Sequence, residues 1–235
     1  MHSKVIVITG GTGRLGTALA LRLKNHGVKI AATYLIPGEA EEFEKAVNLE
    51  PDQLLLRRVD ATDPSQLDEF MNETVETFGQ FGALASLVGG WAAGQDIDEA
   101  SDLRFDRMLD LNLRSAFYTL RAAIPHLKKN GSGRVVFIGS RAVLDTPAGQ
   151  AAFNVAKAGV VALASSAANE LRDHNITVNT VLPAIIDTPA SRSMIPFADY
   201  MDWPEPDEVA AVLEFLTSEE AGVVSGASVP AYGNV

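Results

Sequence analysis

The sequence of 235 residues contains no cysteine, and this absence excludes several kinds of chemistry. Disulfides, thiolate metal sites and cysteine nucleophiles all need a thiol group. Histidine is also scarce, since only four occur, at positions 2, 26, 126 and 174, far apart and without the spacing of metal ligands. We therefore expect no metal site.

Positive charge and long apolar runs are scarce as well. The 19 Lys and Arg residues are outnumbered by 30 Asp and Glu residues, which gives a net charge of -11, whereas nucleic-acid-binding proteins concentrate Lys and Arg. No uninterrupted apolar run reaches the roughly 18 residues of a membrane span. A first strand that starts by Lys4 leaves no room for a signal peptide. We expect a soluble cytoplasmic protein without a nucleic-acid or membrane partner.

Glycine is concentrated near the start of the chain, in the segment IVITGGTGRLG at 6–16. The β-branched run at 5–8 is typical of a strand buried on both faces, and the apolar spacing from Leu15 onward is typical of a helix. Between them, Gly11, Gly13 and Gly16 match the pattern G-x-G-x-x-G, in which a turn without side chains lets backbone amides approach a pyrophosphate. The alternative is a glycine-rich turn that binds nothing.

Strand and helix patterns alternate through the rest of the chain. This alternation predicts a doubly wound parallel sheet of the Rossmann type in a single three-layer αβα domain over 1–235. The ligand crevice of such a sheet lies at the carboxyl ends of its strands. A proline-rich segment at about 184–206 lacks periodicity and would suit a lid over the active site. The expected strands cover 5–8, 27–34, 54–60, 83–88, 134–139, 176–183 and 223–233, and the later helices 63–78, 101–129, 152–171 and 207–217.

Several side chains at the expected strand ends could bind a dinucleotide. The second strand ends at Tyr34, where a carboxylate would hold the adenine ribose. Without this carboxylate, a 2'-phosphate would meet no repulsion here, and Arg14 could attract it. These two features favour NADP(H) slightly over NAD(H), although Arg14 could simply be solvated. Asp60 could accept the adenine amino group or serve as a cap. Gly89 and Gly90 would let a flat ring lie against the backbone.

These motifs resemble the short-chain dehydrogenase/reductase family over essentially the whole chain. The loop TGGTGRLG resembles the family's glycine loop, although Arg14 stands at its middle glycine, and LVGGWAAG stands where the family has N-N-A-G. The resemblance implies catalytic roles for Asn112, Ser140 and Lys157. The coenzyme residues that the loop, the strand ends and the resemblance together indicate are Gly10, Gly13, Arg14, Leu15, Gly16, Tyr34, Asp60, Ala61, Gly89, Gly90, Lys157, Pro183, Ile186 and Thr188.

One group within that family, the dihydropteridine reductases, resembles the chain more closely. The resemblance rests on GGWAAG at 89–94, on the segment 142–160, and on VLPAIIDTP with the later SMIPFADYMDW. It implies reduction of a quinonoid dihydropterin by a nicotinamide coenzyme. Trp91 could then stack on the flat pterin, or it could serve packing alone.

Phe153 departs from the family motif Y-x-x-x-K, in which the tyrosine gives the proton and the lysine lowers its pKa. A phenyl ring has no proton to give, and general acid catalysis is worth roughly 10² to 10⁴ in rate. A quinonoid acceptor is activated, so well-placed hydride transfer could suffice, with Ser140, Lys157 or water passing the proton. Two alternatives stay open: a catalytically impaired nucleotide-binding homologue that acts as a sensor or partner subunit, and a reductase of another carbonyl or imine with a relocated acid.

Each candidate residue also has an ordinary structural alternative. Ser140 could cap a strand end, Lys157 could be a solvated helix lysine, and Asn112 could satisfy backbone in a helix irregularity rather than hold a water. Thr188 could belong to a simple turn. The tyrosines that could replace the lost hydroxyl are Tyr118, Tyr200 and Tyr232. The small residues of the helix at 152–171 suit the interface of a homodimer or homotetramer, although packing on the sheet explains them too.

Overall fold

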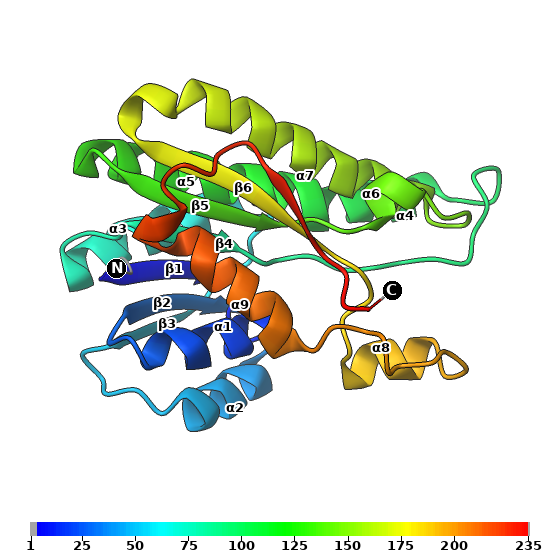
Figure 1. The fold of residues 1–235 in the computed structure, drawn as a ribbon, viewed down its shortest axis with the longest axis horizontal. Helices are drawn as coiled ribbons and strands as arrows, with labels where there is room; N and C mark the ends of the chain where they lie inside the picture. The colour runs from blue at the N-terminus through cyan, green and yellow to red at the C-terminus, as the bar shows by residue number, and fades with distance from the viewer. Residues whose placement is uncertain (1–3, 235) are drawn as a thin grey trace.

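The computed structural model describes residues 4–234 and forms one parallel seven-stranded sheet (Figure 1). The spatial order is β3-β2-β1-β4-β5-β6-β7, so the order reverses between β1 and β4. Such a reversal opens a crevice at the carboxyl ends of the strands, where ligands bind in this class of sheet. The strands are β1 (Val5–Thr9), β2 (Lys29–Tyr34), β3 (Leu54–Arg58), β4 (Ala83–Ser86), β5 (Gly133–Ile138), β6 (Ile176–Pro183) and β7 (Ser228–Ala231).

Helices cover both faces of the sheet, as the alternating pattern predicts (Figure 1). One layer contains α1 (Arg14–Lys24), α2 (Pro37–Val47) and α9 (Pro206–Thr217), and the other contains α3 (Pro64–Phe78), α5 (Ser115–Asn130) and α7 (Ala151–Glu170). Shorter elements are α4 (Asp102–Leu109), η1 (Asp110–Arg114), α6 (Ala142–Asp145), η2 (Arg172–His174), α8 (Pro189–Met194) and η3 (Glu219–Ala221). The three-layer αβα architecture is confirmed.

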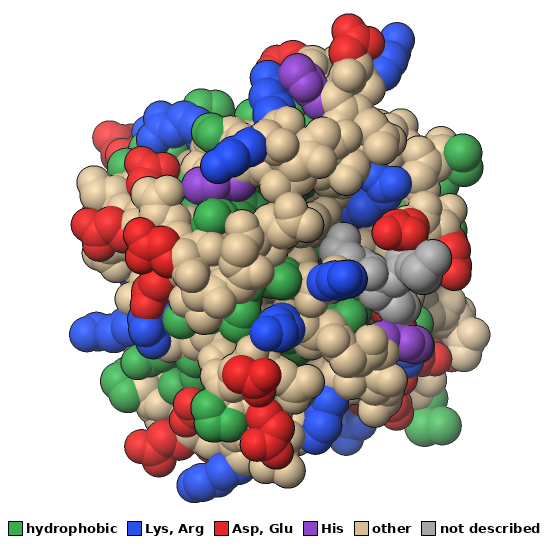
Figure 2. Space-filling model, turned by 90° about the vertical axis from the view of Figure 1, so that its left-hand side faces the viewer, with side chains coloured by type: hydrophobic (Ala, Val, Ile, Leu, Met, Phe, Trp, Pro, Cys, Tyr) green, Lys and Arg blue, Asp and Glu red, His purple; other side chains and the backbone are tan. Residues whose placement is uncertain are grey.

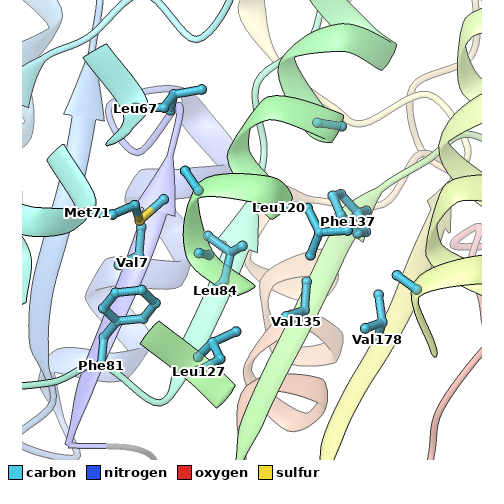
Figure 3. Close-up of a cluster of buried hydrophobic side chains, with 14 of the residues drawn as sticks. Val7, Leu67, Met71, Phe81, Leu84, Leu120, Leu127, Val135, Phe137 and Val178 are labelled. Carbon is cyan, nitrogen blue, oxygen red and sulfur yellow. The ribbon is translucent and has the colours of Figure 1, made fainter. Parts of the chain in front are cut away.

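Two apolar clusters, one on each face of the sheet, form the core. In the cluster drawn in Figure 3, Val135 and Phe137 of β5 lie close to Leu120 and Leu127 of α5. Because both faces of the central strands are covered, β1, β4 and β6 are buried along their whole length, and β1 and β4 are nearly continuous apolar runs rather than alternating patterns.

The element bounds differ from the sequence expectations at a few strand ends. β3 ends at Arg58 rather than at 60, and β4 ends at Ser86 rather than at 88. In each case the chain leaves the ladder early to form the loops that face the crevice. The segment at 184–206, expected to be irregular, contains the helix α8, which starts where Thr188 accepts a hydrogen bond from the Ser191 amide at 3.1 Å.

The long helix expected at 101–129 is continuous but not α-helical throughout. A π-helical segment, η1, separates α4 from α5 and contains the buried Asn112. In it, the Ser115 hydroxyl donates to the Leu111 carbonyl at 2.6 Å. Single π turns of this kind occur frequently at functional sites.

Helix α7 is long and apolar enough to cross a membrane by length and composition alone, with a mean hydropathy of 1.3, although the sequence contains no uninterrupted run of that length. Asn154 and Lys157 interrupt it. Val160, Ala164 and Ala167 pack into the core cluster beside β6. This pattern is that of a helix that covers a sheet.

Acidic and basic side chains are interspersed on the face that holds the amino ends of the strands (Figure 2). No large basic area is visible among the described residues of this face. The ligand crevice lies at the opposite end of the sheet, where α8 projects in Figure 1.

We predict that Phe81→Ala lowers the free energy of unfolding by about 3 to 5 kcal/mol, because it removes a fully buried ring from the core. Urea denaturation measures the change. Phe81 precedes β4 at the end of the sheet away from the crevice. Phe197→Ala, in which the removed ring is 99% exposed, is the control and should change stability by less than about 0.5 kcal/mol. Equal effects of the two variants would contradict this description of the core.

Candidate active site

The glycine loop between β1 and α1 fits a dinucleotide pyrophosphate. Gly13 is the N-cap of α1, makes no side-chain capping bond, and is followed by a first turn without acidic residues. A side chain added at Gly13 would meet only the Gly10 carbonyl, at 3.4 Å, so the loop is open toward the crevice. Uncapped amides at a helix N-terminus are a ready anion site. Arg14 and Leu15 start the helix, and the guanidinium group of Arg14 is exposed.

The other glycines of the loop serve close packing. A Cβ atom at Gly16 would lie 2.4 Å from the Gly11 carbonyl oxygen, and one at Gly11 would lie 2.7 Å from the Ala32 Cβ. Gly10 has a φ of +69°, a conformation that L side chains rarely adopt. Of the glycines in the pattern G-x-G-x-x-G, Gly13 is therefore open to a ligand, whereas Gly11 and Gly16 let the loop pack closely on β2 and on α1.

The ends of β2 and β3 hold the residues that we expect to contact the adenosine of the coenzyme. Tyr34 ends β2 and is half-buried. Asp60 accepts hydrogen bonds from the Thr62 amide at 2.9 Å and the Thr62 hydroxyl at 2.7 Å, all through Oδ1. Asp60 therefore stabilises a turn, as its structural alternative supposes, and only Oδ2 would be available to contact an adenine amino group. Ala61, next in the chain, is buried.

Asn112 holds the backbone of the loop after β4. Its Oδ1 accepts from the Gly90 amide at 3.1 Å, and its Nδ2 donates to the Gly90 carbonyl at 3.0 Å and to the Met108 carbonyl at 3.1 Å. The two hydrogens of the amide are thus both used by backbone, which is the structural alternative for this residue. A Cβ at Gly89 would lie only 2.8 Å from the Asn112 Oδ1, so glycine is required there.

Lys157 is a buried cation rather than a solvated helix lysine, with 5% of its surface exposed. Its Nζ donates to the Ile138 carbonyl at 2.9 Å, at the end of β5. A Cβ added at Gly89 would lie 3.2 Å from the same Nζ, which places the lysine beside the loop after β4. Burial lowers the pKa of Lys157 from 10.5 to about 8, because a desolvated ammonium loses hydration.

Ser140, Phe153 and Lys157 line one cavity of about 580 Å³ at the carboxyl end of the sheet. Phe153 is 7% exposed, and the Lys157 Nζ lies 6.0 Å from the centroid of its ring. The Ser140 Oγ accepts a hydrogen bond from the Ala142 amide at 3.1 Å, in the turn that precedes α6. The predicted coenzyme residues Leu15, Gly89, Gly90, Pro183, Ile186 and Thr188 line the same cavity.

None of the three candidate tyrosines lines this cavity in the described structure. The Tyr200 hydroxyl donates to the Ile195 carbonyl at 3.2 Å, and the Tyr232 ring lies beneath Arg141. Tyr118 belongs to α5 and packs on Phe117. The structure therefore supplies no phenol in place of the one that Phe153 lacks.

The segment after β6 closes one side of the cavity. Asp187 and Arg192 form two hydrogen bonds of 2.6 Å, and the guanidinium group lowers the pKa of the Asp187 carboxyl. The Asp187 amide donates to the Pro204 carbonyl at 2.9 Å, while Trp203 reaches the cavity wall. These bonds give the expected lid a defined conformation.

The sequence analysis named Trp91 but missed three other lining residues, Gln150, Arg141 and Asp145. The Trp91 indole donates to the Gln150 side chain at 2.9 Å, which holds the ring at the cavity wall. Arg141 and Asp145 form an ion pair of 2.7 Å on α6 and also line the cavity. The sequence does indicate the ion pair, because opposite charges four residues apart lie on the same face of a helix. The Trp91–Gln150 contact joins loops 59 residues apart and has no local signal.

The family model described as short chain dehydrogenase matches residues 4–197 of the chain. A 3-oxoacyl-(acyl-carrier-protein) reductase MabA from Mycobacterium bovis is 31% identical over 99% of the chain and 93% of its own length. A levodione reductase from Leifsonia aquatica is 30% identical over 98% of the chain and 93% of its own length.

Solved structures agree with this assignment. A crystal structure of levodione reductase superposes with a TM-score of 0.90 at 28% identity, covering 98% of this chain and 96% of that one. The structure of an NAD+-bound xylitol dehydrogenase, at 24% identity and a TM-score of 0.87, shares the fold. Together, the match of the family model over most of the chain and these relatives show that the chain belongs to the short-chain dehydrogenase/reductase family.

Proposed function

We propose that the protein is an NAD(P)H-dependent reductase that transfers hydride to an activated, pterin-like or quinonoid acceptor. The observation that carries the proposal is the pairing of a buried Lys157 with Phe153 in a cavity that contains no phenol. The coenzyme site and the lysine are kept, whereas the usual proton donor is gone. Such a site favours an acceptor whose reduction does not depend on protonation by tyrosine.

The bound coenzyme supplies the hydride, and the chain positions it. The α1 N-terminus would hold the pyrophosphate, and the Lys157 ammonium, fixed by the Ile138 carbonyl, would hold the nicotinamide ribose. Asn112 keeps the Gly89–Gly90 backbone open for this approach. Ser140, on the same cavity wall, can donate a hydrogen bond to the acceptor, and Lys157 can pass a proton toward it.

The cavity wall supports a flat heteroaromatic acceptor. Trp91 and Phe153 are aromatic residues of this wall, against which a flat ring system could pack. The Arg141–Asp145 pair lies on the same wall. A carboxylate beside a guanidinium complements an aminopyrimidinone edge, which offers N–H donors next to a carbonyl acceptor.

The coenzyme is either NADH or NADPH. The chain favours NADPH slightly, because Tyr34 replaces the carboxylate that usually ends β2, and because the exposed Arg14 can attract a 2'-phosphate. A single carboxylate close to the ribose site would reverse this preference.

Two other functions remain as alternatives. Phe153 favours a catalytically impaired homologue that binds nucleotide and acts as a sensor or partner subunit. The retained Ser140 and Lys157 favour instead a reductase of another carbonyl or imine, in which one of them or water gives the proton. The relatives named above act on different substrates on one fold, so fold alone does not choose between these functions.

We also propose that the protein is a homodimer or homotetramer that uses the outward face of α7. Ala158 and Ala162 are exposed there, and Val155 is half-exposed. Small side chains let helices approach closely, and a two-fold axis would pair this face with itself.

We predict that the protein oxidises NADH or NADPH in the presence of quinonoid dihydropterin, above the nonenzymatic rate, and that Lys157→Ala lowers kcat/KM by roughly 10²-fold or more. Steady-state absorbance at the reduced nicotinamide band measures the rate. The control is Lys45→Ala, which removes an exposed lysine from α2. Coenzyme binding without turnover would favour the nucleotide-binding, noncatalytic function.

We predict that Phe153→Tyr creates or raises activity on an unactivated ketone, by roughly 10²-fold, while turnover of quinonoid dihydropterin changes by less than about threefold. The added hydroxyl supplies the general acid that only the ketone requires. Parallel assays on both substrates measure the split. If dihydropterin turnover rose as much as ketone turnover, the wild-type protein would be an impaired enzyme rather than one suited to activated acceptors.

We predict that kcat/KM decreases as the pH rises through about 8, the pKa of Lys157. Below this pH the amine carries its proton and can hold the ribose and donate; above it, the neutral amine does neither. Because kcat/KM reports the free enzyme, it follows the pKa before coenzyme binds. Lys157→Arg keeps the charge, and its residual activity should lose this alkaline limb. A flat wild-type profile across that pH range would remove the lysine from the proton path.

A further inference from the structure

The glycine loop and the end of β2 form one surface at the coenzyme's adenosine side. The Gly10 amide donates to the Thr33 hydroxyl at 3.0 Å, and the Gly11 amide donates to the Thr33 carbonyl at 2.9 Å. The next loop residue, Thr12, is only 9% exposed. A dinucleotide whose pyrophosphate lies on the α1 N-terminus places its adenine ribose against this surface.

A carboxylate from another element reaches the same surface. Glu39 lies in the first turn of α2, and its Oε2 accepts from the Thr12 hydroxyl at 3.3 Å. The residue is exposed, so its carboxylate is open to a ligand. The N-terminus of α2 stabilises negative charge at this position. The side of the site where β2 has no acidic residue is therefore occupied by an acid 27 residues away from Thr12.

We propose that Glu39 is the residue that selects the coenzyme, and that it makes the protein prefer NADH to NADPH. The inference rests on the proposed function only in requiring a nicotinamide dinucleotide. It reverses the slight preference for NADPH that Tyr34 and Arg14 indicate.

The two coenzymes differ in charge at the adenine ribose. The ribose of NADH offers hydroxyl donors, which a carboxylate accepts in charge-assisted hydrogen bonds. The 2'-phosphate of NADPH brings negative charge to the same place, and like charges at short distance oppose binding. Thr12, already bonded to Glu39, keeps the carboxylate beside the loop.

Two guanidinium groups would favour NADPH instead, because a positive charge attracts the 2'-phosphate. Arg14 is exposed at the start of α1, and Arg58 is exposed at the end of β3, where its Nε donates to the Leu35 carbonyl at 3.3 Å. Of the other charged groups on these elements, Arg57 is paired with Glu73, and Asp60 bonds Thr62. Glu39 is anchored on the loop by the hydrogen bond from Thr12, and Arg58 is held against the backbone after β2. Arg14 has no such anchor among the described residues, so the fixed carboxylate decides for Glu39.

The test measures the dissociation constants of NADH and NADPH for the full chain by quenching of tryptophan fluorescence. Wild type should bind NADH at least about tenfold more tightly than NADPH. Glu39→Gln, which keeps the size and removes the charge, should bring the ratio to within about threefold, mainly by tightening NADPH. The matched control is Glu42→Gln, an exposed glutamate of the same helix, which should leave the ratio unchanged.

Three outcomes would overturn the inference. A wild-type preference for NADPH, lost in Arg14→Gln, would assign selection to the guanidinium group. A preference for NADH that persists in Glu39→Gln would assign it to another group, and thermal unfolding without coenzyme checks that this variant is folded. Binding of neither coenzyme would overturn the proposed reductase as well, whereas the first two outcomes leave the reductase intact.

Discussion

The buried ammonium group of Lys157 is the constraint on which the arrangement of the site depends. A cation without bulk water needs a fixed acceptor, and the Ile138 carbonyl at the end of β5 provides it. That bond ties α7 to the sheet at the point where the strands end. The loop after β4 must pass close to the same nitrogen, which requires glycine at position 89, and the side chain of Asn112 from the π-helical segment holds that loop in place. Three separate parts of the chain are thus fixed around one charge.

The sequence predicted the features that depend on local pattern. The buried parallel strands follow from the apolar runs, and the glycine loop follows from the spacing of the glycines. The sequence could not show that Asn112 spends both amide hydrogens on backbone, because the partner Gly90 lies 22 residues away. It also overlooked Glu39, because the rule of an acid at the strand end examines Tyr34 and not the first turn of the next helix. The helices α6 and α8 are too short to carry a periodic signal.

Membership of the family bears on the type of reaction, whereas the side chain at position 153 bears on the choice of acceptor. The relatives share the family and the fold with this chain, yet their names give unlike substrates, so the fold alone does not define a substrate. In the proposed reductase, the side chain at position 153 would limit turnover to acceptors that need no phenol acid. Trp91, Gln150 and the Arg141–Asp145 pair line the cavity that such an acceptor would enter. Selectivity would then depend on a group that the described cavity lacks as well as on the residues that line it.

The phenyl ring of Phe153 also changes the hydration of the cavity. A phenol at this position would offer a donor and an acceptor to bound water, whereas the ring edge offers neither. Most of the neighbouring wall is aliphatic or aromatic, including Ile185, Ile195 and Trp203. Water in such a place has few partners, and replacing poorly held water with an apolar surface favours binding. The cavity is thus drier beside Phe153 than it would be beside a tyrosine, so the apolar face of an entering ring would displace the solvent there at little cost.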